Sequence, residues 1–141
     1  MTLLRTLATL GATRRAATAL EFALVAGAAL LIIFGVIELG LLMWTKNALQ
    51  YTATAAARCA AMGSPGCGNA QQYAVTKAGN MVFSGIIQAS DVTVSAATTC
   101  NGASGKFQVV TINAGYWANA SLPPPFNGIT LQATGCYPTA S

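Results

Sequence analysis

The chain has 141 residues, of which 54% are hydrophobic and only 7% are charged, whereas soluble domains have about a quarter of their residues charged. Seven basic and three acidic residues give a net charge of +4, but no basic cluster lies beyond residue 58, so we expect no nucleic-acid binding. Histidine is absent, and Asp91 is the only acid after Trp44, so we also expect no enzyme activity, no bound metal and no cofactor.

The N-terminal segment, residues 1–16, is basic. It carries Arg5, Arg14 and Arg15 and no acid, and a hydrophobic run follows directly. Lys46 is the nearest basic residue beyond that run. Positive charge favours the cytoplasmic side of a membrane, so we expect a single-pass membrane protein with a cytoplasmic N-terminus. Its C-terminal part then lies outside, in an oxidising compartment.

Two glutamates interrupt the hydrophobic run. The apolar stretch between Glu21 and Glu38 has sixteen residues. As a helix it covers about 25 Å, whereas a bilayer core is about 30 Å thick. The membrane segment must therefore continue past at least one glutamate, which places a carboxylate inside the membrane or at its edge.

The apolar run continues into an alanine-rich segment with no glycine or proline before Gly63. Alanine favours helix strongly, so we expect one transmembrane and extended helix over residues 17–62. A cleaved secretory signal is an alternative, with a small-residue site around Gly27. That alternative is disfavoured because the apolar run continues well beyond the site.

The remaining residues, 63–141, predict a small extracytoplasmic α+β domain. A helical pattern covers residues 70–84. Alternating or β-branched residues predict three strands, over residues 91–95, 107–112 and 128–133. Residues 101–105 predict the hairpin loop between the first two strands, and residues 123–125 an extended connector before the third. We expect a three-stranded antiparallel sheet packed on the short helix.

The four cysteines, at positions 59, 67, 100 and 136, allow three disulfide pairings. A zinc site is disfavoured because no CxxC pair is present. Cys59 lies in the last turn of the long helix, and Cys67 follows the next turn. In an up-down-up sheet, Cys100 and Cys136 end the first and third strands at the same edge. We therefore predict Cys59–Cys67 and Cys100–Cys136.

Residues 14–58 carry a family resemblance. Basic residues, a small-residue junction and then Glu-Phe in a hydrophobic helix resemble the class III signal of prepilins. The segment RRAATALEFALV, followed by IIFGVIELGLLMWTKNALQYTATAAAR, is similar to the TadE-like pseudopilins of tight-adherence (Flp-type) pili. The resemblance implies cleavage between Ala16 and Ala17 by a prepilin peptidase, with Glu21 and Phe22 as assembly residues. Ala16 departs from the family, which usually has glycine before the cut.

Glu21 has a physical reason to be paired. A lone carboxylate in hydrocarbon costs about 2.5–3.5 kcal/mol on insertion scales. Cleavage after Ala16 creates an ammonium group at Ala17, about one helical turn away, on the same chain or a neighbouring subunit. In the alternative interpretation, Glu21 lies at the inner headgroup boundary beside Arg14 and Arg15.

Glu38 lies on another part of the helix surface, a quarter turn or more from Glu21. The resemblance implies a role in subunit contact or in peptidase handling, and the alternative is a water-bonded residue at the outer boundary. Ala19, Ala23 and Gly27 recur every four residues, a stripe suited to helix packing. Any alanine-rich membrane helix can also produce such a stripe.

The resemblance implies a minor pseudopilin-like structural or assembly component of a tight-adherence (type IVc-like) pilus, held in the inner membrane with its C-terminal part periplasmic or extracellular. The partners that it implies are the membrane, a prepilin peptidase, other pilin or pseudopilin subunits and the assembly platform. The alternative is an unprocessed, membrane-tethered binding module. Its contact residues would be Tyr116, Trp117 and Tyr137, which equally suit the core of the sheet.

Overall fold

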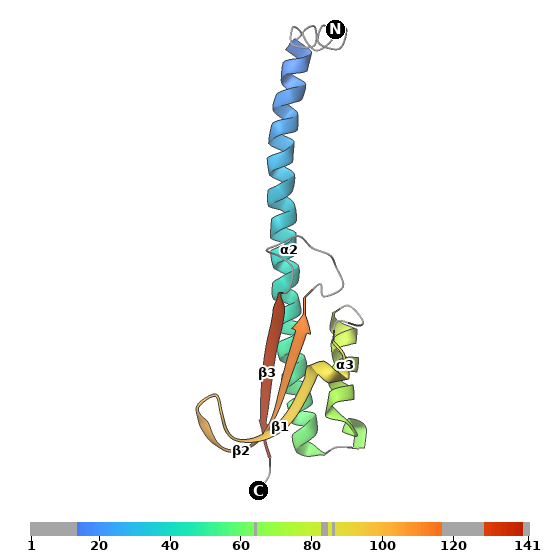
Figure 1. Ribbon diagram of the computed structural model, residues 1–141, viewed down its shortest axis with the longest axis vertical. Helices are drawn as coiled ribbons and strands as arrows, with labels where there is room; N and C mark the ends of the chain where they lie inside the picture. Colours follow the sequence, from blue (N-terminus) through green and yellow to red (C-terminus); the bar gives the residue numbers. More distant parts are fainter. Residues whose placement is uncertain (1–13, 64, 83–84, 86, 117–128, 140–141) are drawn as a thin grey trace. The chain divides into compact units, whose positions relative to one another are not determined.

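The computed structural model describes residues 14–63, 65–82, 85, 87–116 and 129–139. Its elements, in chain order, are helix α2 (Arg14–Met62), 3-10 turn η1 (Pro65–Cys67), helix α3 (Ala70–Met81), 3-10 turn η2 (Ala89–Asp91) and strands β1 (Val92–Cys100), β2 (Ala103–Gly115) and β3 (Thr130–Pro138) (Figure 1). The predicted α+β class is confirmed, with a long apolar helix, a short helix and a three-stranded antiparallel sheet. The predicted connector at 123–125 lies outside the described residues.

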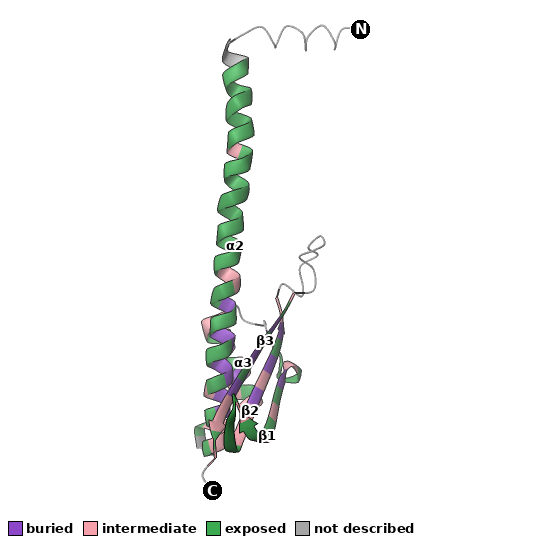
Figure 2. Cartoon of the chain, turned by 90° about the vertical axis from the view of Figure 1, so that its left-hand side faces the viewer, coloured by how far each residue is buried: buried purple, intermediate pink, exposed green. Residues whose placement is uncertain are grey.

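Residues 1–41 and 42–141 form two compact units, and the boundary between them lies within α2. In the first unit, none of the side chains that the structure describes is buried (Figure 2). Large apolar side chains such as Phe22 and Leu31 are 74% and 77% exposed. Water is an unfavourable environment for so much apolar surface. By length and composition, this helix is suited to cross a membrane.

The second unit builds its core between the end of α2 and the sheet. The buried side chains of α2 recur every three or four residues and are mostly small: Thr45, Ala48, Leu49, Thr52, Ala53, Ala56, Ala57 and Cys59. Ala74 and Ala78 of α3 join the same core. Because alanine extends little beyond the backbone, the helix axis can lie close to the sheet. The alanine-rich composition that favours helix also sets this short packing distance.

The sheet has the order β1-β2-β3, with antiparallel neighbours, as the predicted meander requires. Its inner face carries Val110 and Ile112, which are fully buried. Val92 pairs with Ile112 from one side, and Ala133 pairs with it from the other. Along β2, the buried residues Val110, Ile112 and Ala114 alternate with more exposed ones, as expected for a sheet covered by helices on one face (Figure 2).

Both edge strands are tied to helices through glutamine side chains. Gln71 of α3 donates from Nε2 to the carbonyl oxygen of Val92 in β1, at 2.9 Å. Gln50 of α2 donates from Nε2 to the carbonyl oxygen of Thr134 in β3, at 2.7 Å. Edge strands have backbone groups without a strand partner. These two amides satisfy one such carbonyl on each edge and hold each helix in register with its strand.

Helix α3 begins where predicted but ends earlier. Asn69 caps it, because its Oδ1 accepts from the backbone N–H groups of Gln71 and Gln72, at 2.9 and 3.3 Å. The helix ends at Met81, and Val82 is extended, so the prediction that it continues to residue 84 is wrong at residue 82. The sequence predicted too long a helix because its residues remain compatible with a helix up to residue 84. The helix ends at Met81 because the backbone of Val82 is extended.

The predicted five-residue hairpin loop is also wrong. The turn contains only Asn101 and Gly102, at φ 47° and 83°, and pairing resumes between Cys100 and Ala103. Two successive positive φ values define the two-residue turn that Asn-Gly favours. The glycine and serine residues after it belong to β2. A register shift between Ala97 and Thr99 accommodates an additional β2 residue.

Both predicted disulfides, Cys59–Cys67 and Cys100–Cys136, are present, with Cα–Cα distances of 5.5 and 6.5 Å. The second bond joins β1 to β3 although β2 lies between them in the sheet. Cys136 is opposite Val109, whereas Cys100 lies near the hairpin tip opposite Ala103. The β1–β2 hairpin curves at its tip (Figure 1), and this curvature lets the two cysteines meet.

Removing the Cys100–Cys136 bond is expected to destabilise the protein more than removing the Cys59–Cys67 bond. In the chain-entropy model, the Cys100→Ala/Cys136→Ala double variant loses about 3–4 kcal/mol, against about 2–3 kcal/mol for Cys59→Ala/Cys67→Ala, because it releases a longer loop. Urea unfolding of the full chain in detergent, followed by circular dichroism, measures both. Equal losses would contradict the loop-length argument.

Candidate functional site

The residues predicted for assembly lie along the first part of α2. The backbone at Ala16 and Ala17 is helical, so the predicted cleavage junction lies within α2. Glu21, Phe22 and Glu38 are exposed. Neither glutamate forms an ion pair with any residue that the structure describes. The helix therefore presents both carboxylates to its surroundings.

The predicted packing stripe is also open. Ala19, Ala23 and Gly27 are exposed, and a Cβ placed on Gly27 would meet no atom within 4 Å beyond its chain neighbours and the backbone of its own helix. Residues four apart lie on one side of a helix. The stripe is therefore open to contact with a helix of another subunit.

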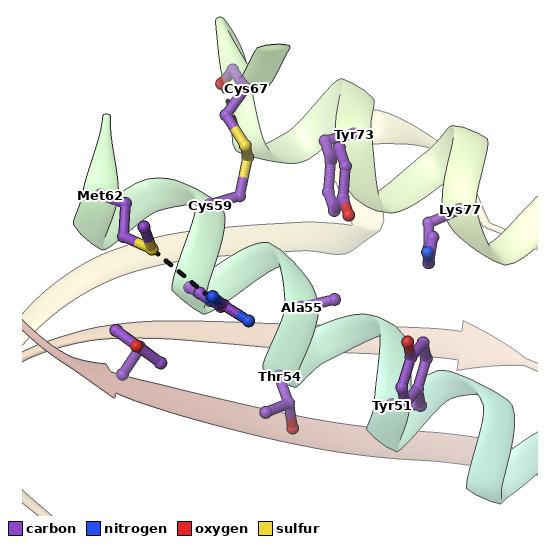
Figure 3. A pocket seen from close by; sticks show the side chains of 10 residues that line it. Tyr51, Thr54, Ala55, Cys59, Met62, Cys67, Tyr73 and Lys77 are labelled. Atoms are coloured by element: carbon purple, nitrogen blue, oxygen red, sulfur yellow. Dashed lines mark hydrogen bonds between the residues drawn. A yellow bond between two sulfur atoms is a disulfide. The ribbon is translucent and has the colours of Figure 1, made fainter. Parts of the chain in front are cut away.

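The second unit contains a pocket of about 530 Å³, mainly between α2 and α3 (Figure 3). We call it the α2/α3 pocket; its lining residues are Tyr51, Thr54, Ala55, Arg58, Cys59, Met62, Cys67, Tyr73, Lys77 and Tyr137. Tyr51 and Arg58 are two turns apart on α2, and Tyr73 and Lys77 are one turn apart on α3, so each pair shares a helix face. The Cys59–Cys67 bond connects the end of α2 to the segment leading into α3.

Each cation of the pocket lies near a tyrosine ring. The Arg58 guanidinium is 6.0 Å from the ring centroid of Tyr137, and Lys77 Nζ is 5.6 Å from that of Tyr51. Both distances suit a cation–π interaction. Arg58 Nε also lies 3.4 Å from Met62 Sδ, as a hydrogen-bond donor (Figure 3). These contacts orient both cations without neutralising them.

No carboxylate lines the α2/α3 pocket. The only acid of residues 42–141 is Asp91, which is engaged elsewhere. Its Oδ2 accepts from the backbone N–H of Gln88 at 2.8 Å, and its Oδ1 from the hydroxyl of Ser90 at 3.5 Å. The pocket therefore has a positive electrostatic potential that the described part of this unit does not balance.

The sequence analysis did not predict this pocket. The spacings within each helix are visible in the sequence, but nothing in it places α3 beside that face of α2. Among the predicted contact residues, Tyr116 and Tyr137 are half-buried against the core, and Tyr137 also lines the pocket. Trp117 lies outside the described residues.

Fold and site together define a small disulfide-bonded α+β unit that follows a helix long and apolar enough to cross a membrane. The family resemblance is confirmed over that helix: residues 16–58 match the model of the TadE-like protein family. The match suggests involvement in tight-adherence pilus assembly. No curated protein and no solved structure significantly matches the chain.

Proposed function

We propose that this chain is a minor pseudopilin-like subunit of a tight-adherence pilus. The single observation that carries the proposal is the TadE-like match over residues 16–58, which includes the predicted cleavage junction and both membrane glutamates. The exposed apolar surface of the same helix supports membrane anchoring. A substantial disulfide-bonded unit follows the match, which supports a minor component rather than a major pilin made of little but the helix.

In this proposal the helix holds the chain in the inner membrane, and the domain folds on the periplasmic or extracellular side. Two disulfides are consistent with an oxidising compartment. A prepilin peptidase removes the leader, and the new amine of Ala17 pairs with Glu21. The exposed stripe of α2 then packs against other subunits or the assembly platform. We propose a structural role and no catalytic one.

Cleavage tests the proposal directly. Co-expression with a cognate prepilin peptidase is expected to remove about 1.7 kDa and to leave Ala17 as the first residue, as a class III-like leader requires. Mass spectrometry of the purified chain measures both. The Ala16→Gly variant is expected to be processed faster, because glycine is the usual residue before the cut.

The control is the same co-expression with a catalytically inactive peptidase, which should leave Met1 in place. An intact N-terminus with the active enzyme, in both the natural chain and Ala16→Gly, would reject the pseudopilin proposal. It would favour the membrane-tethered binding module, which needs no processing.

A further inference from the structure

We propose that the α2/α3 pocket binds an acidic segment of a partner protein, with its carboxylates held by Arg58 and Lys77. The proposal goes beyond a role in pilus assembly and does not depend on it. It concerns residues 42–141, whereas leader cleavage and helix packing concern the first part of α2. Either proposal can therefore fail while the other stands.

The first argument is charge complementarity. Two cations line one pocket, and neither forms an ion pair with a described residue. Four of the seven basic residues lie in residues 42–141, against the single acid Asp91, whose carboxylate is already hydrogen-bonded. A carboxylate of a partner would gain a charge-assisted hydrogen bond at the guanidinium or at the ammonium group. The two cations therefore favour an anionic ligand.

The second argument concerns the kind of ligand. Aromatic residues, methionine and arginine are enriched at protein interfaces, and all three line this pocket. Lys77 lies over the ring of Tyr51 and Arg58 over that of Tyr137, so a cation occupies one face of each of these two rings. The lining combines these cations with apolar surface at Met62 and Ala55. That combination suits a glutamate or aspartate side chain, with its apolar stem and charged end.

The third argument is that the walls are already in place. The Cys59–Cys67 bond restrains the connection between the two helices, and the Gln71–Val92 hydrogen bond ties α3 to the sheet. Figure 3 shows Tyr73 and Lys77 of α3 beside the α2 face that carries Tyr51 and Ala55. A ligand therefore does not have to order the pocket first, which lowers the free-energy cost of binding.

The test uses the full chain in detergent micelles and a fluorescent peptide, rhodamine-Ala-Glu-Leu-Glu-Ala-amide. Fluorescence polarisation measures its affinity, with the glutamine version of the peptide as the matched probe. We expect the glutamate peptide to bind, and the glutamine peptide to bind about tenfold more weakly. Arg58→Gln and Lys77→Gln should each weaken binding about threefold to tenfold.

Lys46→Gln is the matched control, because it removes the same charge from an exposed site of α2 outside the pocket. Its affinity should equal that of the natural chain. Lys77→Gln keeps a helix-compatible residue in α3, so it remains informative if Arg58→Gln misfolds; circular dichroism and non-reducing electrophoresis verify the fold. Absence of glutamate-peptide binding, equal binding of both peptides, or equal loss in Lys46→Gln would overturn the proposal. Tighter binding of a glucuronate oligomer than of the peptide would overturn it in favour of an acidic sugar.

Discussion

Replacing Gly135 with alanine is expected to lower the free energy of unfolding by about 4 kcal/mol or more, close to the whole stability of a small domain. A Cβ at this position of β3 would overlap the backbone carbonyl of Ala53 and the backbone nitrogen of Thr54 in α2. Backbone atoms cannot rotate away as a side chain can. The helix and the strand would have to separate, which would also strain the adjacent Gln50–Thr134 hydrogen bond and open the core.

Gly79→Ala is the matched control and should change stability in the opposite direction. Gly79 lies within α3 and has no positive φ, and a Cβ added there would meet no atom within 4 Å beyond its chain neighbours and the backbone of its own helix. Alanine in a helix interior is favoured over glycine by about 0.5–1 kcal/mol. Urea unfolding of the full chain in detergent, followed by circular dichroism, compares the two variants. A Gly135→Ala protein as stable as the natural one would show that α2 does not approach β3 this closely.

Replacing Glu21 with glutamine is expected to reduce the incorporation of this chain into subunit complexes by about tenfold or more, while membrane insertion continues. Insertion continues because a neutral amide costs less in hydrocarbon than a carboxylate. In the proposed pairing, incorporation fails because the ammonium group that cleavage would create at Ala17 loses its anionic partner in a low-dielectric environment. Crosslinking in membranes that contain the pilus subunits, together with pilus yield, measures the effect.

The assignment to Glu21 can be separated from a general loss of charge. Glu38→Gln removes the same charge elsewhere on the helix and should reduce incorporation less. Glu21→Asp keeps the carboxylate and should restore part of the yield. With an inactive peptidase, no new amine forms, so Glu21→Gln should have no additional effect. Normal crosslinking in cleaved Glu21→Gln would assign Glu21 to the headgroup boundary instead.

The fold class and both disulfides could be predicted because they depend on local patterns and chain connectivity. An apolar run followed by alanine-rich sequence specifies a helix, and alternating residues specify strands. Cys59 and Cys67 are close in the chain, so a single turn brings them together. Cys100 and Cys136 end strands of one meander at the same edge, although the hairpin must curve to join them. The turn was mispredicted because Gly and Ser were assigned to a loop, whereas Asn101 and Gly102 suffice to reverse the chain.

The sequence by itself determined which residues form the apolar helix and which cysteines pair. Only the tertiary structure decided that Gly135 must lack a side chain and that Arg58 and Lys77 share one pocket. The reason is that helical and strand periodicity assign residues to faces of single elements, while contact between elements depends on how closely they pack. Alanines on α2 permit that close packing, and the Cys59–Cys67 bond and the Gln71–Val92 hydrogen bond then restrain α3 beside it.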